Sequence, residues 1–495
     1  MNISRRRIIR TTGYTFIGVA LFMVPSLLYA LFTSDLVCVR AFAIPVSIML
    51  LLGLIMRFAV KPPNGHIWIR DGYLNIFIIM FISAIAGAVP YFLGIPGCGA
   101  IEAIFESTAG LSTTSASVLY EPSLPYSMML WKAIEHWIGG LCVLIFIISL
   151  LPQFGLGDQQ ISTVESHGTY INKIAPKSSL ITKYIIGIYA GFTVIAFVYF
   201  MICCDAPFDA VMLALASTST SGVLIHPEGI SYYDSFLVET GVSIFTILSS
   251  ISFVLYIHII KKHYSEVKRN IEIRAFIGII VVSTFIIALI LFFSNTGKDF
   301  VTSLRDSFFQ TASFITTSGF ALEDYTAWPS AACFVLMLMM LIGGCSASTT
   351  GAFKVIRLLI VEKLIERGFL KHMHPRAVHA VKVGNSTISA DTASSVTSFA
   401  ILYLAVIIIS TVILSLQNID LETSFSAVIG TISNDGISFG QIGMGGDYSM
   451  FHPLLKIYLC FLMIVGRLGL MTMLLIFLPS FWKPNKKSRH HVVKA

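Results

Sequence analysis

The chain has 495 residues, of which 56% are hydrophobic and 12% charged, with a formal net charge of +7 and a mean hydropathy of +0.82. A soluble domain carries about 25% charged residues, so these values exclude a large soluble protein and favour a chain that crosses a membrane many times. The net charge is too small to indicate nucleic acid, so we expect the lipid bilayer as a partner and no nucleic acid.

Two apolar runs open the chain, at about 13–33 and 40–59. The basic start at Arg5–Arg7 leads into the first run without a small-residue cleavage site, which indicates a retained membrane span rather than a signal peptide. A polar linker follows and ends at Gly72. We therefore predict an N-terminal transmembrane hairpin and linker over 1–72.

The rest of the chain repeats one plan four times: an apolar span, a helix too short to cross, a polar turn and a second apolar span. The sequence thus predicts an all-α membrane protein with four tandem span–pore-helix–span repeats around one pore, preceded by an extra transmembrane hairpin. The repeats are predicted at 73–152, 153–262, 263–370 (with an interrupted last span) and 371–495 (with a cytoplasmic linker and a C-terminal tail). The short helices are predicted at 100–110, 207–216, 301–314 and 422–432. The returning spans of the second and fourth repeats are predicted over 235–260 and 453–478.

Charge predicts the orientation of these repeats. Lys and Arg gather at both termini and in the linkers between repeats, whereas 205–234 and 418–453 contain acidic residues and no Lys or Arg. By the positive-inside rule, both termini are predicted to be cytoplasmic and all four turns to open outward.

The four polar turns at 112–116, 219–223, 316–320 and 433–437 are rich in small hydroxyl residues. One such turn alone is most simply a connector between membrane helices, but four on the same side favour a pore. We expect their backbone carbonyls to replace part of the hydration shell of a monovalent cation, with the glycines making the bend. The predicted filter residues are Thr113, Thr114, Ser115, Thr220, Ser221, Gly222, Thr317, Ser318, Gly319, Asn434, Asp435 and Gly436.

Two residues depart from the fourfold pattern. Ser115 stands where the other turns have Gly, and a side chain there restricts the backbone; our hypothesis is a looser site that passes sodium as well as potassium. Asp435 precedes the glycine of the fourth turn. Its carboxylate either accepts hydrogen bonds from neighbouring amides or adds negative charge that concentrates cations at the mouth.

The returning span of the third repeat is interrupted at 343–352 by small and polar residues. Close helix packing is one interpretation; we favour a loop beneath the filter that obstructs the pore. The candidate gate residues are Gly343, Gly344, Ser346, Ser348, Thr349, Thr350, Gly351 and, in the last span, Arg467.

A charge as deep as Arg467 must face the interior of the bundle. It either binds carbonyls of a broken helix or lies beside the pore and opposes cation passage. Lys354 and Arg357 are predicted to be anchors at the membrane interface.

Several segments resemble the Trk/Ktr/HKT superfamily of cation transporters, and most closely its TrkH type. The resemblance rests on segments 130–140, 342–345, 354–357, 374–385, 466–468 and 479–483, and it covers nearly the whole chain. It implies a homodimer in the cell inner membrane with one pore per chain, potassium uptake or symport, and gating by a TrkA-like cytosolic nucleotide-binding subunit. It also implies that the 343–352 break and Arg467 form the gate. Ser115 departs from the glycine of a potassium-selective member and resembles a sodium-preferring subgroup.

Two other classes of function fit the sequence less well. An ion-coupled carrier with alternating access usually has inverted repeats, whereas these repeats run parallel. An intramembrane enzyme needs a nucleophile–base pair or metal-ligand spacing, which the sequence lacks. The predicted function is therefore potassium uptake through a channel-like pore, with a sodium-permeable transporter or a carrier as alternatives and no enzymatic activity.

Overall fold

The computed structural model describes residues 5–61, 69–154, 178–223, 225–294, 299–376, 379–384 and 386–482. The polar linkers predicted within 62–68 and 155–177, and the basic tail from residue 483 onward, lie outside the described residues.

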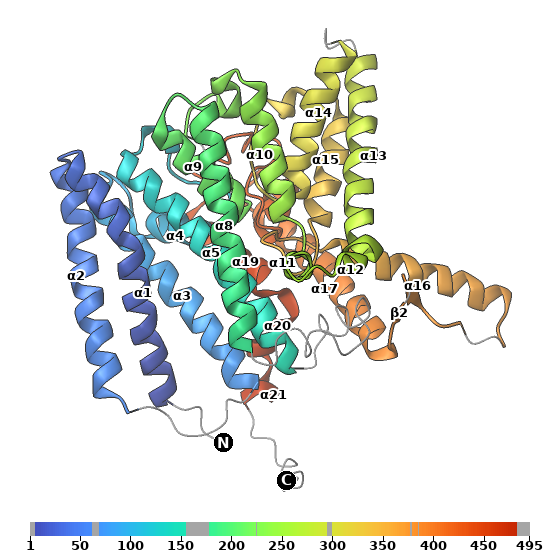
Figure 1. Cartoon of the computed structure of the whole chain (residues 1–495), viewed down its shortest axis with the longest axis horizontal. Coiled ribbons are helices and arrows are strands. Elements are labelled where there is room, and N and C mark those ends of the chain that lie inside the picture. Colours follow the sequence, from blue (N-terminus) through green and yellow to red (C-terminus); the bar gives the residue numbers. More distant parts are fainter. Residues whose placement is uncertain are drawn as a thin grey trace, which may run out of the picture.

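The N-terminal hairpin consists of α1 (Arg5–Phe32) and α2 (Leu36–Ala59), which lie side by side at one edge of the molecule (Figure 1). Asp35 begins α2, because its side chain accepts hydrogen bonds from the amides of Val37 and Cys38, as N-cap residues do. The helices approach closely where Gly13 of α1 faces Gly53 of α2; a Cβ at either position would lie 3.0 Å or less from backbone oxygen of the other. The predicted hairpin is therefore present and packs through small residues.

Each repeat contains a span, a short helix ending in the interior and a returning span, in the expected order. The first repeat has α3 (Ile69–Gly94), α4 (Ala100–Ser112), η1 (Glu121–Ser123) and α5 (Tyr126–Phe154). The second has α8 (Ser178–Cys203), α9 (Pro207–Ser219), η2 (Gly229–Tyr233), α10 (Phe236–Ser249), α11 (Phe253–Ile260) and α12 (Tyr264–Arg269).

The third repeat has α13 (Ile271–Phe293), α14 (Phe300–Ile315), η3 (Tyr325–Ala327), α15 (Ser330–Ile342) and α16 (Val355–Met373). The fourth follows a small hairpin of β1 (Lys382–Val383) and β2 (Ser386–Thr387), and has α17 (Ala390–Ser415), α18 (Leu421–Ile432), α19 (Pro453–Leu468), α20 (Leu470–Leu474), η4 (Leu475–Phe477) and α21 (Pro479–Trp482). The repeat boundaries stated above remain a proposal.

The returning spans differ from the sequence expectation. The spans expected over 235–260 and 453–478 are each broken: α10 and α11 meet at 88°, and α19 bends by 117° into the segment after Gly469. With the expected interruption after α15, three of the four returning spans are broken. In the described residues, seven helices are long and apolar enough to cross a membrane, or nine if each bent pair counts as one span. The tenth predicted span is the interrupted one, of which α15 is the shorter apolar part.

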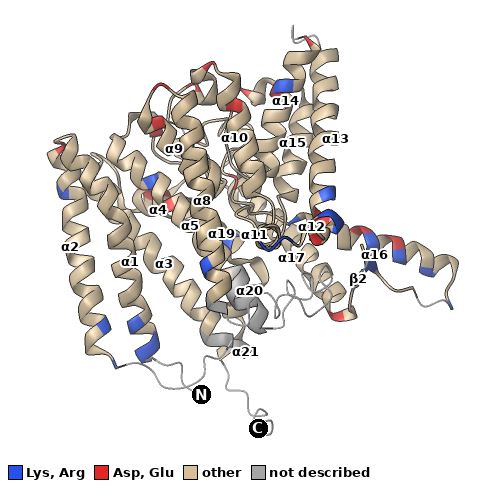
Figure 2. Cartoon of the chain, in the orientation of Figure 1, with Lys and Arg blue, Asp and Glu red and all other residues tan. Residues whose placement is uncertain are grey.

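The surface of the bundle is strongly apolar, and large side chains such as Ile202, Phe293 and Leu416 are exposed. Such a belt is what a hydrocarbon solvent requires. Charged residues lie mostly away from it: Figure 2 shows Lys and Arg near the lower ends of α1 and α2, at α12 and along α16, and several acidic residues at the opposite end near α9 and α10. This distribution is consistent with the orientation predicted from the positive-inside rule.

Candidate functional site

The four short helices α4, α9, α14 and α18 end in the same type of turn. Beyond each helix, the residue at the second position of the turn has a left-handed backbone: φ is 55° at Thr113, 52° at Thr220, 50° at Thr317 and 59° at Asn434. The next residue donates its amide hydrogen to the carbonyl five positions earlier in every repeat, as in a Schellman C-cap. These four N···O distances are Thr114–Ala109 2.9 Å, Ser221–Ala216 3.0 Å, Ser318–Ser313 3.0 Å and Asp435–Gly430 2.9 Å. The four turns are therefore structurally equivalent.

The four turns lie in direct contact with one another. The Ser115 amide donates to the Asp435 carbonyl at 2.9 Å, and the Ser115 hydroxyl donates to the Ser318 carbonyl at 2.9 Å and accepts from the Gly222 amide at 2.6 Å. One serine of the first turn thus bonds to the other three. The twelve predicted filter residues come together from four distant parts of the chain.

The predicted reason for the glycines is only partly right. Gly319 and Gly436 have positive φ, but Gly222 does not, and the left-handed residue common to all four turns is a threonine or asparagine. Gly222 is required by space instead, because a Cβ there would lie 2.5 Å from the Gly319 carbonyl oxygen. A Cβ at Gly436 would overlap the Ser115 amide. Close approach of four backbones, rather than the bend alone, favours glycine at this position.

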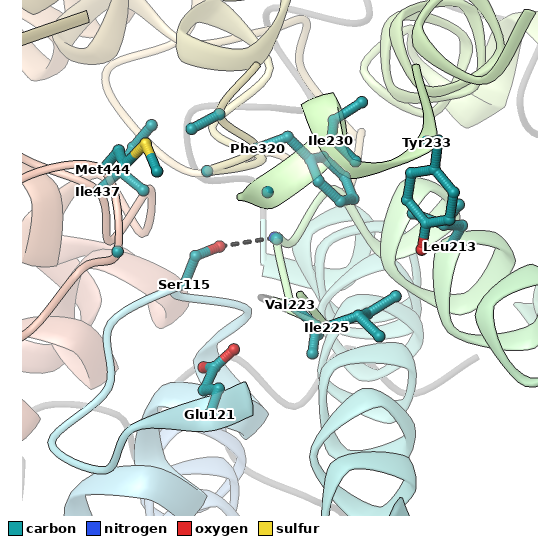
Figure 3. A pocket seen from close by; sticks show the side chains of 15 residues that line it. Ser115, Glu121, Leu213, Val223, Ile225, Ile230, Tyr233, Phe320, Ile437 and Met444 are labelled. Carbon is teal, nitrogen blue, oxygen red and sulfur yellow. Dashed lines mark hydrogen bonds between the residues drawn. The ribbon is translucent and has the colours of Figure 1, made fainter. Parts of the chain in front are cut away.

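A small cavity of about 30 Å³ lies at these turns. It is large enough for a water-sized species. Its lining includes Ser115, Gly222 and Gly319 together with Glu121 and apolar side chains such as Phe320. Figure 3 shows the Ser115 hydroxyl directed at the second turn, with Glu121 from the same repeat nearby. The turns thus border a space that is polar on the backbone side and carries one carboxylate.

Asp435, in the fourth turn, is fully buried. Its carboxylate faces the Gly319 amide without forming a hydrogen bond of normal geometry. The neighbouring Asn434 donates its side-chain amide to the Thr114 hydroxyl at 3.1 Å and to the Met463 carbonyl at 2.9 Å. Asn434 therefore joins the first turn to α19. The Asp435 carboxylate, by contrast, accepts no hydrogen bond from the described residues.

A buried ion cluster behind the first turn was missed by the sequence reasoning. Lys132 on α5 is fully buried and donates to Glu106 on α4 at 2.7 Å and to Glu121. The other oxygen of Glu106 accepts hydrogen bonds from the Ser117 hydroxyl and from the amides of Val118 and Leu119, at 2.6–3.1 Å. The cluster fixes the chain just after the first turn. Its signal was a lysine in a predicted span, which demands a buried partner.

The interrupted segment between α15 and α16 packs against the other side of the turns. The Gly351 amide donates to the Thr317 hydroxyl at 3.0 Å, and the hydroxyls of Thr220 and Thr349 lie 3.0 Å apart. A Cβ at Gly351 would overlap the Ser433 carbonyl oxygen. We call residues 343–354 the intramembrane loop. It contacts the second, third and fourth turns directly.

Two basic side chains hold this loop. Arg467 is buried and donates from Nη1 to the Thr349 carbonyl at 2.6 Å, while its Nε and Nη2 have no hydrogen-bond partner among the described residues. Lys354 donates to the Thr350 hydroxyl at 2.8 Å and to the Thr350 carbonyl. The expectation that Lys354 is an interface anchor was wrong, because its ammonium group is turned back into the loop.

A second cavity, of about 670 Å³, lies on the loop's other side and is lined by Gly351, Arg467, Lys354 and Arg357 together with apolar residues of α17 and α20. The loop and Arg467 therefore separate this cavity from the turns. Of the predicted gate residues, Thr349 and Gly351 face the turns, and Ser348 and Thr350 bond to one another at 2.8 Å. Gly344 instead faces Thr350 within the loop and Ser250 at the end of α10, and Ser346 bonds to Glu272 on α13.

Comparison with known proteins places the chain in a family. The TrkH family model, described as a cation transport protein, matches residues 41–484. This chain belongs to the TrkH family. A crystal structure of the potassium transporter TrkH from Vibrio parahaemolyticus matches with a TM-score of 0.89 and 26% identity, covering 97% of this chain and 100% of that one. The match confirms the predicted four-repeat helical architecture.

Two curated relatives extend the comparison. The Trk system potassium uptake protein TrkH of Salmonella typhimurium is 29% identical over 448 residues, which is 90% of this chain and 92% of the relative. The Trk system potassium uptake protein TrkG of Escherichia coli is 28% identical over 492 residues, 98% and 100% of the two chains. Since the family consists of transport proteins, the expectation of a transporter rather than an enzyme is confirmed.

Proposed function

We propose that this TrkH-family chain takes up potassium through a pore whose filter is the set of four contacting turns. The observation that carries the proposal is the fourfold recurrence of one capped turn, each at the C-terminus of a helix that ends in the bundle interior. Helix C-termini carry partial negative charge, and backbone carbonyls suit a monovalent cation better than a divalent one. Potassium is proposed as the ion because the relatives are described as potassium uptake proteins.

The second part of the proposal is that the intramembrane loop is the gate. Its contacts with Thr220, Thr317 and Ser433 support a position across the route from the filter to the larger cavity. Arg467 adds a positive charge beside that route and holds the loop through the Thr349 carbonyl. Cation passage then requires the loop to move aside, which a loop of small residues can do without repacking large side chains.

The assembly is proposed from the family resemblance. We infer a homodimer in the cell inner membrane, with cytoplasmic termini and a TrkA-like nucleotide-binding subunit on the cytoplasmic side. The basic α12 and α16 regions support this side as cytoplasmic. Coupling to a second ion, as in symport, stays part of the proposal.

Ser115 supports sodium permeability as the second candidate function. Its hydroxyl bonds to both the second and the third turn, so a side chain occupies a position where the other repeats have only backbone. An ion that enters must compete with this hydroxyl for the Ser318 carbonyl. We infer that the filter discriminates potassium from sodium less strictly than one with four glycines.

The test is rubidium and sodium flux into liposomes that contain the purified protein. For Ser115→Gly we expect the potassium-to-sodium preference to rise about tenfold, the factor that corresponds to roughly 1.4 kcal/mol, or about one hydrogen bond. Ser123→Gly, eight residues on in an exposed turn, is the matched control and leaves the preference unchanged. Equal preferences in wild type and Ser115→Gly would rule out the selectivity role. An absence of rubidium flux from folded wild-type protein would overturn potassium uptake itself.

A further inference from the structure

Glu272 is a buried carboxylate that neither the filter nor the gate proposal uses. It is the second residue of α13 and is 2% exposed. One of its oxygens accepts the Ser346 amide at 2.6 Å and the Ser346 hydroxyl at 2.9 Å. The amide of Ile356, in the first turn of α16, lies near this carboxylate. Glu272 thus binds the intramembrane loop at Ser346.

The same half of the loop is fixed by the break between α10 and α11. The Cys345 amide donates to the Ser250 carbonyl at 3.0 Å, and the Phe253 amide donates to the Ala347 carbonyl at 2.9 Å. The Thr349 hydroxyl donates to the Ser249 carbonyl at 3.1 Å. These carbonyls and amides are free of helical bonds because the span is broken there. The first half of the loop therefore packs against the second repeat and α13. Its second half packs against the filter turns.

The contacts of Glu272 are of the strong kind. Hydrogen bonds to a carboxylate are shorter and about twice as strong as neutral ones, and a buried carboxylate without donors is unfavourable. Glu272 accepts these two hydrogen bonds only while Ser346 stays in place. If the first half of the loop moved away from the filter, the carboxylate would lose both donors.

We propose that Glu272 is a latch, a positioning residue that holds the intramembrane loop against the filter in the closed state. The inference rests on the proposed gate and adds the group that sets the closed–open balance. The latch is tied to the cytoplasmic side, since its neighbour Ile271 packs against the small core of α16 and β1 that contains Ile356 and Val383. Movement of that core would therefore shift Glu272 relative to the loop.

The test is basal rubidium flux in liposomes without any regulatory protein. Glu272→Ala removes the acceptor, so we expect flux to rise about tenfold with an unchanged potassium-to-sodium preference, because the closed state loses its stabilisation. Glu362→Ala is the matched control; this glutamate lies on α16 with a side chain 63% exposed, and its removal leaves flux at the wild-type level.

Ser346→Ala provides a second variant that keeps the carboxylate and loses one of its hydroxyl bonds. We expect a smaller rise, and the double variant Glu272→Ala with Ser346→Ala should exceed Glu272→Ala little, because both act on one contact. A thermal melt of each variant shows whether the fold persists. Unchanged or lower flux from folded Glu272→Ala overturns the latch, as does full additivity of the two changes.

The outcome is separable from that of the gate itself. Gly351→Ala pushes the other half of the loop off the Ser433 carbonyl without touching Glu272. If Gly351→Ala raises flux and Glu272→Ala does not, the gate stands and the latch is wrong. If neither variant raises flux, the gate proposal fails together with the latch.

Discussion

The returning spans of the first and third repeats occupy equivalent places but are built in opposite ways. In the first repeat, α5 runs unbroken from Tyr126 to Phe154, and its buried Lys132 is paired with two carboxylates. In the third repeat, α15 ends at Ile342 and the loop replaces the helix directly beside the turns. At equivalent places, the first repeat therefore has a continuous helix, α5, whereas the third repeat has a loop without helical hydrogen bonds.

The difference lies in where the polar groups find partners. A continuous helix satisfies most of its own backbone groups, and Lys132 of α5 pairs with two glutamates of its own repeat. The intramembrane loop has its backbone groups bonded to Ser250, Glu272 and Arg467, which belong to three different elements. Its position is therefore set by the rest of the molecule. A regulatory input can reach the loop more easily than it can reach α5.

The largest effect is expected from Lys132→Met, which destabilises the first repeat around α5. This change leaves Glu106 and Glu121 buried without their cation, which costs about 3–5 kcal/mol. We expect loss of most folded protein, measured by size-exclusion chromatography and thermal melting in detergent. Lys371→Met, on an exposed part of α16, removes the same charge and leaves the melt unchanged. A normal melt for Lys132→Met would show that the cluster is dispensable.

The second test compares Gly351 in the intramembrane loop with Gly368 on α16. A Cβ at Gly351 overlaps the Ser433 carbonyl oxygen, whereas a Cβ at Gly368 on α16 meets no atom within 4 Å. Because the filter turn is capped and cross-bonded, the loop should yield first. We expect Gly351→Ala to raise basal rubidium flux about fivefold by destabilising the closed arrangement and Gly368→Ala to have no effect. Reduced flux with normal folding would mean that the loop supports the filter instead of blocking it.

The smallest effect is expected at Arg467. Among the described residues, its guanidinium donates one hydrogen bond to the loop, at the Thr349 carbonyl. Arg467→Ala therefore removes roughly 1 kcal/mol of closed-state stabilisation and a positive charge beside the route. We expect basal flux to rise about threefold, measured by the same rubidium assay, and Arg274→Ala at an exposed site to change nothing. A Lys at position 467 should restore part of the block if charge is what matters; complete failure to do so would favour the hydrogen bond alone.

Much of the plan could be predicted from sequence. The low charge content, the apolar runs and the four Ser/Thr-rich turns predicted the repeats, and the break after α15 was expected from its glycines and hydroxyls. The breaks after Ser249 and at Gly469 were not expected, since 235–260 and 453–478 are apolar enough to be single spans. Hydropathy measures transfer to lipid and carries no information on whether a helix stays straight.

The amino-acid sequence by itself determined that this chain lies in a membrane, that it repeats one unit four times, and that Ser115 differs from its three counterparts. Only the tertiary structure decided which groups meet. In it, Ser115 bonds to three turns, Lys132 lies between two glutamates, and Glu272 accepts hydrogen bonds from the loop. Residues this far apart in the chain come together only through helix packing. Hydrogen bonds and packing contacts form only when distances are right to within a few tenths of an ångström. The order of residue types along the chain does not specify distances between remote residues.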